Sequence, residues 1–437
     1  MKKTILIQCQ SITYYYNALG AIYTKYPNED IDIDVLITSN IFLCDKFLQK
    51  IKQSKYVRNV YAFDYKTFAK INKKIRKNKK TPLNTFLFNS LYKPQICKKI
   101  KNLLKNETYS DIIYSQETQY NLTAYLKFTY PEAHFIMYGD GSGILIGSNT
   151  KLDNPLDKPF DYKFFKEMKP DEVIALAPFM EDDSLDVNNI PISAINTSKL
   201  QNIIIGDENI QKDINNFTEQ LLNKYSDYKN KVMLLMSQLD DEKYKMSQEE
   251  QIKLYSDIIE NYCQDNSLVI LKLHPTTRKD ILSVLQQNCS KQYEFLFIPE
   301  NLKEYPVEIY ANLIKNLNSV ITFLSSSSMS LSCLYGIKTI DAYDVIQKYP
   351  LKERVNSYLK VYNEVIKRLP NWDKKSLIYK CDLVPEIIKF YETDKNRTKT
   401  EQKSKLTFRQ KLFSVTNINS AYSKKRQFVI CGLKITV

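Results

Sequence analysis

Short apolar runs alternate with amphipathic stretches along the chain, and this alternation occurs in two similar series. Such runs are typical of strands buried in a parallel sheet, and stretches of helical period are typical of helices on its faces. The predicted strands of the first series are residues 4–8, 31–38, 57–63, 111–114, 134–138 and 173–176. Those of the second series are residues 231–236, 268–273, 295–298, 320–324 and 339–342. The predicted helices between strands include residues 41–51, 84–101 and 248–263. The pattern predicts an α/β fold with parallel, doubly wound sheets.

Two such series in 437 residues predict two domains, because one hydrophobic core seldom spans a chain of this length. We expect a first Rossmann-like domain over residues 1–185 and a second over residues 231–390. Residues 186–230 are a polar connection with one helical segment, and residues 391–437 are a basic and apolar tail. This organisation is typical of the arrangement called GT-B, in which two Rossmann-like domains face a cleft. Other two-domain α/β enzymes show the same pattern.

Composition narrows the class of protein. The chain is 43% hydrophobic and has no uninterrupted run of about 20 apolar residues, which a membrane span needs. Its start, Met-Lys-Lys-Thr-Ile-Leu-Ile-Gln, is basic, but the apolar part is shorter than that of a signal peptide. We therefore expect it to be the first strand of a cytoplasmic protein. The eight cysteines include no Cys-x-x-Cys pair, which favours reduced thiols over a disulfide framework or a zinc site.

The net charge of +14 predicts a negatively charged partner. The excess lies largely in residues 70–80 and in the tail from Lys395 onward. Neither segment carries a nucleic-acid-binding motif, so nucleic acid is not the expected partner. The tail mixes basic and apolar residues, and two interpretations fit it equally well. Either it lies on an anionic membrane surface, at the inner face of the cytoplasmic membrane, or it forms a terminal strand or hairpin that packs on the body.

The predicted strand over residues 268–273 ends abruptly at His274-Pro275, and the chain has only two histidines. Proline keeps His274 extended, so this histidine stands at the carboxyl end of a strand, where open α/β sheets place ligands. Lys272 lies two residues earlier and therefore on the same face. An ammonium and an imidazole in one space suit a phosphate-bearing leaving group, because the first offsets its charge and the second donates a proton. A purely structural histidine is the alternative.

Four consecutive serines follow the predicted strand over residues 320–324. They are Ser325, Ser326, Ser327 and Ser328. Hydroxyls and unpaired N–H groups at a helix start bind anions, whereas a helix cap needs only one serine. Glu308, which follows Pro306 near another predicted helix start, would accept hydrogen bonds from two ribose hydroxyls or would merely favour the helix dipole.

In the first series, the predicted strand over residues 134–138 ends in Gly139-Asp140-Gly141-Ser142-Gly143, which holds three of the eight glycines. Glycines after a strand let a ligand approach the backbone closely. Asp140 would then lie at the edge of the sheet and is a candidate general base, with Gly141 and Ser142 beside the acceptor. A tight turn is the plainer interpretation of the same residues.

Together these segments resemble the motifs of bacterial GT-B sialyltransferases and polysialyltransferases. That family has an acidic-acidic-glycine motif in the first domain, and a His-Pro motif and a serine-rich motif in the second. Gly139-Asp140-Gly141, His274-Pro275 and residues 325–328 agree with these motifs in order and in domain. The resemblance covers most of residues 1–390.

The resemblance implies a role for each residue. Asp140 deprotonates the acceptor hydroxyl, His274 faces the phosphate of CMP as general acid, and the serines bind that phosphate. A lysine and a ribose-binding glutamate that recur in the family resemble Lys272 and Glu308.

One departure from the family pattern concerns the base. The family has an acidic residue where this chain has Gly139. The base is therefore either Asp140 or another carboxylate, for which Glu117, after the predicted strand over residues 111–114, is a candidate.

The resemblance implies an inverting transfer of sialic acid from CMP-sialic acid to a glycan acceptor, such as lipooligosaccharide, capsule or an oligosaccharide terminus. It implies no metal or other cofactor. One alternative is another CMP-releasing transferase, of the polysialyl, Kdo or CDP-glycerol type, and a second is a non-catalytic protein of the same fold that binds anionic glycans. Phe323-Leu324 counts against the CDP-glycerol type, in which an acidic residue usually precedes the serines. Formation of a homodimer stays open.

Overall fold

The computed structural model divides by its internal contacts into two compact units, Met1–Pro385 and Glu386–Val437. The structure describes residues 2–9, 11–38, 45–63, 93–105, 107–115, 120–139, 170–176, 191–236, 246–273, 284–285, 287–289, 292–303, 305–322, 325, 327–349, 413–420, 423–430 and 433–436.

The first unit begins with a seven-stranded parallel sheet of order β3-β2-β1-β4-β5-β6-β7. Its strands are β1 (Lys3–Cys9), β2 (Ile31–Thr38), β3 (Asn59–Phe63), β4 (Asp111–Ser115), β5 (His134–Gly139), β6 (Glu172–Ala175) and β7 (Ile192–Ala194). The order of the first six strands is that of a Rossmann sheet.

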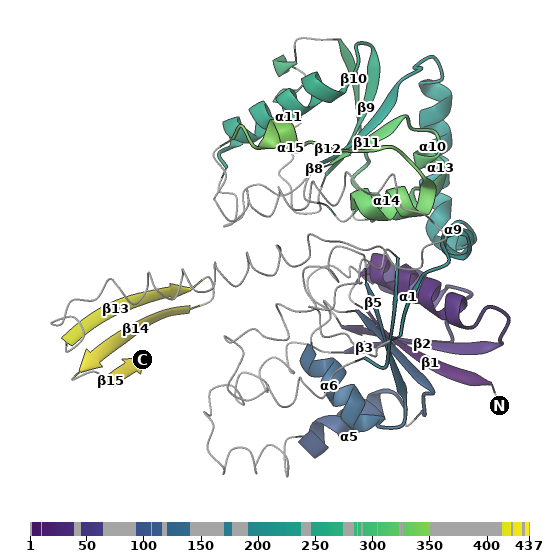
Figure 1. Cartoon of the computed structure of the whole chain (residues 1–437), viewed down its shortest axis with the longest axis vertical. Helices are drawn as coiled ribbons and strands as arrows, with labels where there is room; N and C mark the ends of the chain where they lie inside the picture. The colour runs from purple at the N-terminus through teal and green to yellow at the C-terminus, as the bar shows by residue number, and fades with distance from the viewer. Residues whose placement is uncertain are drawn as a thin grey trace. The chain divides into compact units, whose positions relative to one another are not determined.

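Helices cover both faces of this sheet (Figure 1). Helices α5 (Lys93–Leu103) and α6 (Tyr120–Thr129) pack on one face, where Leu6 and Ile112 join Ile100 and Leu126 in a buried cluster. Helix α1 (Ile12–Lys25) contacts β1, β4 and β5 and covers the other face, and α2 (Asp45–Lys52) contacts β3. Because both faces are covered, the strands read as nearly continuous apolar runs.

The second half of this unit repeats the design with a five-stranded parallel sheet of order β10-β9-β8-β11-β12. Its strands are β8 (Lys231–Met236), β9 (Ser267–Leu273), β10 (Tyr293–Phe297), β11 (Ser319–Thr322) and β12 (Thr339–Asp341). The helices are α9 (Thr197–Ile205), α10 (Glu208–Lys224), α11 (Gln248–Tyr262), α13 (Ala311–Ile314), α14 (Ser327–Tyr335) and α15 (Tyr343–Ile346). Counted within this half, the strand order again matches a Rossmann sheet.

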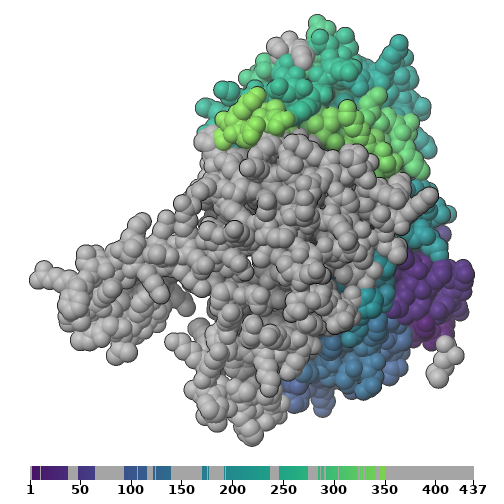
Figure 2. Space-filling view, viewed as in Figure 1, coloured from purple at the N-terminus to yellow at the C-terminus, as the bar shows by residue number. Residues whose placement is uncertain are grey.

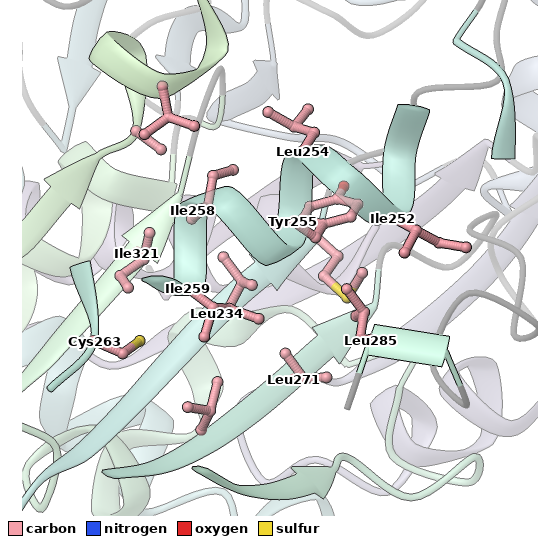
Figure 3. Packing of buried hydrophobic residues seen from close by; sticks show 14 of the residues in the cluster. Leu234, Ile252, Leu254, Tyr255, Ile258, Ile259, Cys263, Leu271, Leu285 and Ile321 are labelled. Carbon is pink, nitrogen blue, oxygen red and sulfur yellow. The ribbon is translucent and has the colours of Figure 1, made fainter. Parts of the chain in front are cut away.

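Helix α11 packs its apolar stripe on one face of the second sheet. Figure 3 shows Leu254, Ile258 and Ile259 of this helix among Leu234 and Ile321 from the strands. In the space-filling view, the green and teal residues of this half lie together at the top (Figure 2). The helix begins with a capping box, which satisfies two backbone N–H groups at its start.

The predicted fold class, two doubly wound Rossmann-like sheets, is confirmed. All predicted strands occur, and their ends differ from the predicted ones by at most two residues. One expectation needs correction: residues 186–230 are more than a polar connection with one helix. Strand β7 pairs with β6 and extends the first sheet into this segment, and two helices, α9 and α10, follow. A three-residue strand is too short to leave a readable apolar pattern.

The second unit contains the terminal strands that the sequence allowed. Strands β13 (Phe413–Ser420), β14 (Ser423–Ile430) and β15 (Leu433–Thr436) form an antiparallel sheet in that order. Among the helices of the described residues, none combines the length and the apolar character that crossing a membrane requires.

Candidate functional site

The candidate site lies at the carboxyl ends of β9 and β11, which flank β8 in the second sheet. In open parallel sheets, ligands bind outside these strand ends, near the point where the strand order reverses. Lys272 is the second-to-last residue of β9, and Ser325 follows β11 just before α14 begins. The predicted lysine and the predicted serines therefore belong to strand ends on either side of β8.

Lys272 is a buried cation, with only 7% of its surface exposed. Its Nζ donates a hydrogen bond to the carbonyl oxygen of Lys303 at 2.7 Å and lies 5.9 Å from the ring centroid of Tyr310. Burial lowers the pKa of Lys272 from 10.5 to about 8, and the nearby Glu308 carboxylate partly opposes this change. The ammonium is therefore held in place but poorly solvated.

The carbonyl of Lys303 is fixed by the turn to which it belongs. The backbone N–H groups of Leu302 and Lys303 both donate to the carbonyl of Pro299, at 2.8 and 2.9 Å. The buried Tyr310 hydroxyl donates to the carbonyl of Leu302 at 2.5 Å. This loop therefore presents a rigid acceptor to Lys272.

Glu308 is the buried anion of the site and is 8% exposed. It lies in a short 3-10 helix, Val307–Ile309, after Pro306. Its Oε1 accepts a hydrogen bond of 2.6 Å from the hydroxyl of Ser330, a residue of α14 that is 3% exposed. Within the described residues, Ser330 is the one side-chain donor to this carboxylate.

The start of α14 shows how one of the serines acts. The Oγ of Ser325 accepts a hydrogen bond of 3.3 Å from the backbone N–H of Ser327, the first residue of the helix. Ser327 and Ser328 are the first two residues of α14. Their position places helix-start N–H groups, which attract anions, beside the carboxyl end of β11.

The structure thus brings Lys272, Glu308 and helix α14 into one region. Gly139 is the last residue of β5 and pairs with Ala175. The other predicted site residues lie outside the described part of the chain: Glu117, Asp140, Gly141, Ser142, His274, Pro275 and Ser326.

Two groups of this site were missed from sequence. Ser330 lies three residues after Ser327 on the same helix, and this spacing was a signal that could have identified it. The Lys303 carbonyl has no sequence signal, because every residue carries one. Among the described residues, no group of three or more histidine, cysteine, aspartate or glutamate side chains could hold a metal ion.

No protein-family model and no curated protein matches the chain. Solved structures do match it. The α/β-galactoside α-2,3-sialyltransferase of Photobacterium phosphoreum is 14% identical, with a TM-score of 0.47, over 88% of this chain and 100% of that one. The UDP-GlcNAc 2-epimerase of Methanocaldococcus jannaschii is 14% identical, with a TM-score of 0.45, over 90% and 100% of the two chains. The epimerase of Neisseria meningitidis bound to UDP-GlcNAc is 12% identical, with a TM-score of 0.46, over 91% and 100%. These identities and TM-scores add nothing to what the strand order of the two sheets already shows about the fold.

Proposed function

We propose that the chain is an inverting sialyltransferase, which transfers sialic acid from CMP-sialic acid to a glycan acceptor. The observation that supports this function is the grouping of buried Lys272, the Glu308–Ser330 pair and the start of α14, where Ser325 accepts from the N–H of Ser327, near the ends of the two strands that flank β8. A cation, a helix N-terminus and a carboxylate are complementary to the phosphate and the ribose hydroxyls of a nucleoside monophosphate.

Each group has a counterpart on CMP. The phosphate would accept hydrogen bonds from Lys272 Nζ, which has three donors and uses one on Lys303, and from the N–H groups at the start of α14. The ribose hydroxyls would donate to Glu308, whose Oε1 already accepts from Ser330.

The buried ammonium argues for an anionic ligand. A charge that is taken out of water costs free energy unless an opposite charge or hydrogen bonds compensate for it. The lowered pKa of Lys272, about 8, reflects that cost, and Glu308 offsets only part of it. A bound phosphate would offset the rest, which makes Lys272 a binding group rather than a stabilising one.

In the proposed reaction, the acceptor hydroxyl attacks the anomeric carbon of sialic acid on the side opposite to CMP. A bond forms between the acceptor oxygen and that carbon, the bond from the carbon to the phosphate oxygen breaks, and the configuration inverts. Asp140 takes the proton of the acceptor hydroxyl, and His274 gives a proton to the departing phosphate. Lys272 and the serines stabilise the charge on CMP as it leaves.

Thermal-shift measurements with CMP, UMP, UDP, UDP-GlcNAc, CMP-sialic acid and CDP-glycerol test the donor class. A ligand at about 100 times its dissociation constant stabilises the folded protein by about 2.7 kcal/mol, so a CMP-selective rise in Tm is the expected result. A response to UDP and none to CMP would contradict the proposal.

A second measurement tests transfer itself. Incubation with CMP-sialic acid and sialyl acceptors should release CMP steadily, only when acceptor is present, and equally in EDTA. Binding of CMP without turnover on any acceptor supports the non-catalytic alternative, and turnover with CMP-Kdo instead supports a Kdo transferase.

A further inference from the structure

The register of the C-terminal sheet separates apolar from polar residues. Directly paired residues of antiparallel strands lie on one face, and successive residues of a strand alternate between faces. The pairs Phe413–Ile430, Val415–Phe428, Phe428–Ile435 and Ile430–Leu433 therefore belong to a single face. We call its six apolar residues the apolar face: Phe413, Val415, Phe428, Ile430, Leu433 and Ile435.

The opposite face of the sheet is mostly polar. It carries residues such as Thr416, Gln427 and Thr436, and Ile418 and Val429 are its two apolar members. The sheet is therefore amphipathic, and its two faces differ in the kind of surface on which they can lie.

Positive charge accompanies the apolar face. Asn417 pairs with Arg426 and Asn419 pairs with Lys424, which places both basic residues on the same face, towards the β13–β14 turn. The three described strands carry Lys424, Lys425, Arg426 and Lys434 and no acidic residue. From Lys395 to Val437 the sequence has eleven lysines and arginines and one glutamate, so +10 of the chain's net charge of +14 lies in the tail.

A three-stranded sheet with one apolar face needs a surface to cover that face. The first unit of the same chain is one such surface, and a full-length protein that does not bind vesicles would favour it over a membrane. Among surfaces outside the chain, the charge decides which one fits. A second copy of the chain would bring a tail with the same net charge of +10 and would be repelled. Nucleic acid would accept the basic residues through its phosphates but offers nothing for six apolar residues. An anionic membrane offers hydrocarbon and, directly above it, negative headgroups.

We propose that strands β13–β15 are a peripheral membrane-binding sheet. The apolar face lies at the boundary between headgroups and acyl chains, and the basic residues lie at the level of the anionic headgroups. This inference does not depend on the reaction that the first unit catalyses, so either proposal can fail without the other.

Flotation of the full-length protein with lipid vesicles tests the inference. We expect it to bind vesicles of phosphatidylcholine with about one-third phosphatidylglycerol, and to bind vesicles of phosphatidylcholine alone at least about tenfold more weakly, because each basic residue near an anionic surface contributes about a factor of five. The double variant Phe428→Ser/Ile435→Ser, paired on the apolar face, should reduce binding by at least about tenfold.

The matched control is Ile418→Ser/Val429→Ser, which removes two apolar residues from the same sheet on its opposite face and should bind as the wild type does. An unchanged Tm in both variants shows that the first unit stays folded. Equal losses in the two variants, or equal binding to neutral and anionic vesicles, would overturn the proposal. So would a dimer that Phe428→Ser/Ile435→Ser dissociates, or an affinity for oligonucleotides that exceeds the affinity for vesicles.

Discussion

At the scale of single residues, the fold buries two opposite charges, one near the end of strand β9 and one in the short 3-10 helix Val307–Ile309. Lys272 and Glu308 are 7% and 8% exposed, and among the described residues their charged groups form hydrogen bonds with the Lys303 carbonyl and the Ser330 hydroxyl. A charge that burial disfavours costs the folded state free energy, and the lowered pKa of Lys272 shows such a cost. This cost in stability therefore fits a role in binding, and three predictions concern this balance.

Lys272→Met should stabilise the unliganded protein and abolish nucleotide binding. The pKa of Lys272 is lowered from 10.5 in the unfolded chain to about 8 in the folded one, so the folded state binds this proton more weakly. At pH 7 this pKa difference means that the charged lysine lowers the free energy of unfolding by about 3 kcal/mol. Methionine removes that penalty but also loses the hydrogen bond to the Lys303 carbonyl, which contributes about 1 kcal/mol. We expect the free energy of unfolding in urea to rise by about 2 kcal/mol.

The pH dependence gives a second readout of the same variant. Wild-type stability should rise relative to that of Lys272→Met as the pH increases from about 8 towards 10.5, because the folded wild type has then already released the proton. Lys272→Arg, which keeps the charge, is the control and should show no stabilisation at pH 7. A less stable methionine variant that still binds CMP would refute the assignment.

Glu308→Gln should shift the pH profile of nucleotide binding to lower pH. Glutamine keeps an acceptor for the Ser330 hydroxyl but removes the carboxylate that raises the pKa of Lys272. Lys272 should then lose its proton, and with it the phosphate, at a lower pH than in the wild type. Calorimetric titration with CMP from about pH 6 to about pH 9 measures this shift. Ser330→Ala is the control: it retains the Glu308 carboxylate and should leave the midpoint of the pH profile unchanged. If Glu308→Gln and the wild type had the same midpoint, the prediction would be contradicted.

The proposed acid and base make a sharper prediction about turnover. His274→Ala should lower kcat by about 10²-fold or more, which is the usual scale for a general acid. Asp140→Asn should abolish transfer and spare CMP binding, since the base acts on the acceptor. Glu117→Gln is the matched control: a loss of transfer there, with Asp140→Asn active, would move the base to Glu117.

At the scale of secondary-structure elements, the site depends on contacts from several elements to one short loop. The carbonyl of Ile309 accepts a hydrogen bond of 2.9 Å from Gln211 of α10, and the carbonyl of Glu308 accepts one of 2.6 Å from Tyr335 of α14. The loop is therefore held from two helices as well as by its own turn. Strand β9 places Lys272, and helices α10 and α14 hold the short loop that carries Glu308.

Ser247→Ala should destabilise the second half without changing the site. Ser247 Oγ accepts from the N–H of Glu250 at 3.2 Å, and the Glu250 carboxylate accepts from the N–H of Ser247 at 2.7 Å. The loss of this cap of α11 should lower the free energy of unfolding, measured in urea, by about 1 kcal/mol and leave the affinity for CMP unchanged. Lys253→Ala, an exposed position of the same helix, should change the free energy of unfolding by less than about 0.5 kcal/mol. Equal effects of the two variants would show that the cap contributes nothing.

At the scale of the whole molecule, a buried polar cluster joins the two halves of the first unit. Asp207, which precedes α10 and is 2% exposed, accepts hydrogen bonds from Tyr16 at 3.2 Å and from Ser54 at 3.3 Å. The hydroxyl of Tyr15 donates to Ser54 at 2.8 Å. Burial raises the pKa of Asp207, and the two hydrogen bonds oppose that change.

Asp207→Ala should destabilise the protein by about 2 to 3 kcal/mol, because it leaves two buried hydroxyls without an acceptor. Asp207→Asn keeps an acceptor and removes the buried charge, so at pH 7 it should cost less than about 1 kcal/mol or stabilise. The raised pKa means that the contribution of Asp207 to stability falls as pH rises through that value, and the asparagine variant should lack this dependence. Urea unfolding across acidic pH checks both statements, and equal losses in the two variants would exclude the hydrogen-bonding role.

The sequence by itself determined the α/β class, the two parallel sheets and the approximate position of every predicted strand. It could do so because burial on both faces requires continuous apolar runs, and this is a local property of the chain. The same local logic identified Lys272 and Ser325 at strand ends and Glu308 after Pro306, since the ends of elements are where the backbone leaves groups for a ligand.

Only the tertiary structure decided which of these residues meet, and through which partners. Glu308 bonds to Ser330, 22 residues later, and Lys272 to a carbonyl 31 residues away. Tyr16 reaches Asp207 across 191 residues, and β7 joins the first sheet although it is only three residues long. Such contacts depend on how distant segments fold back on one another, and a carbonyl, a short strand or a single hydroxyl leaves no periodic signal in the sequence.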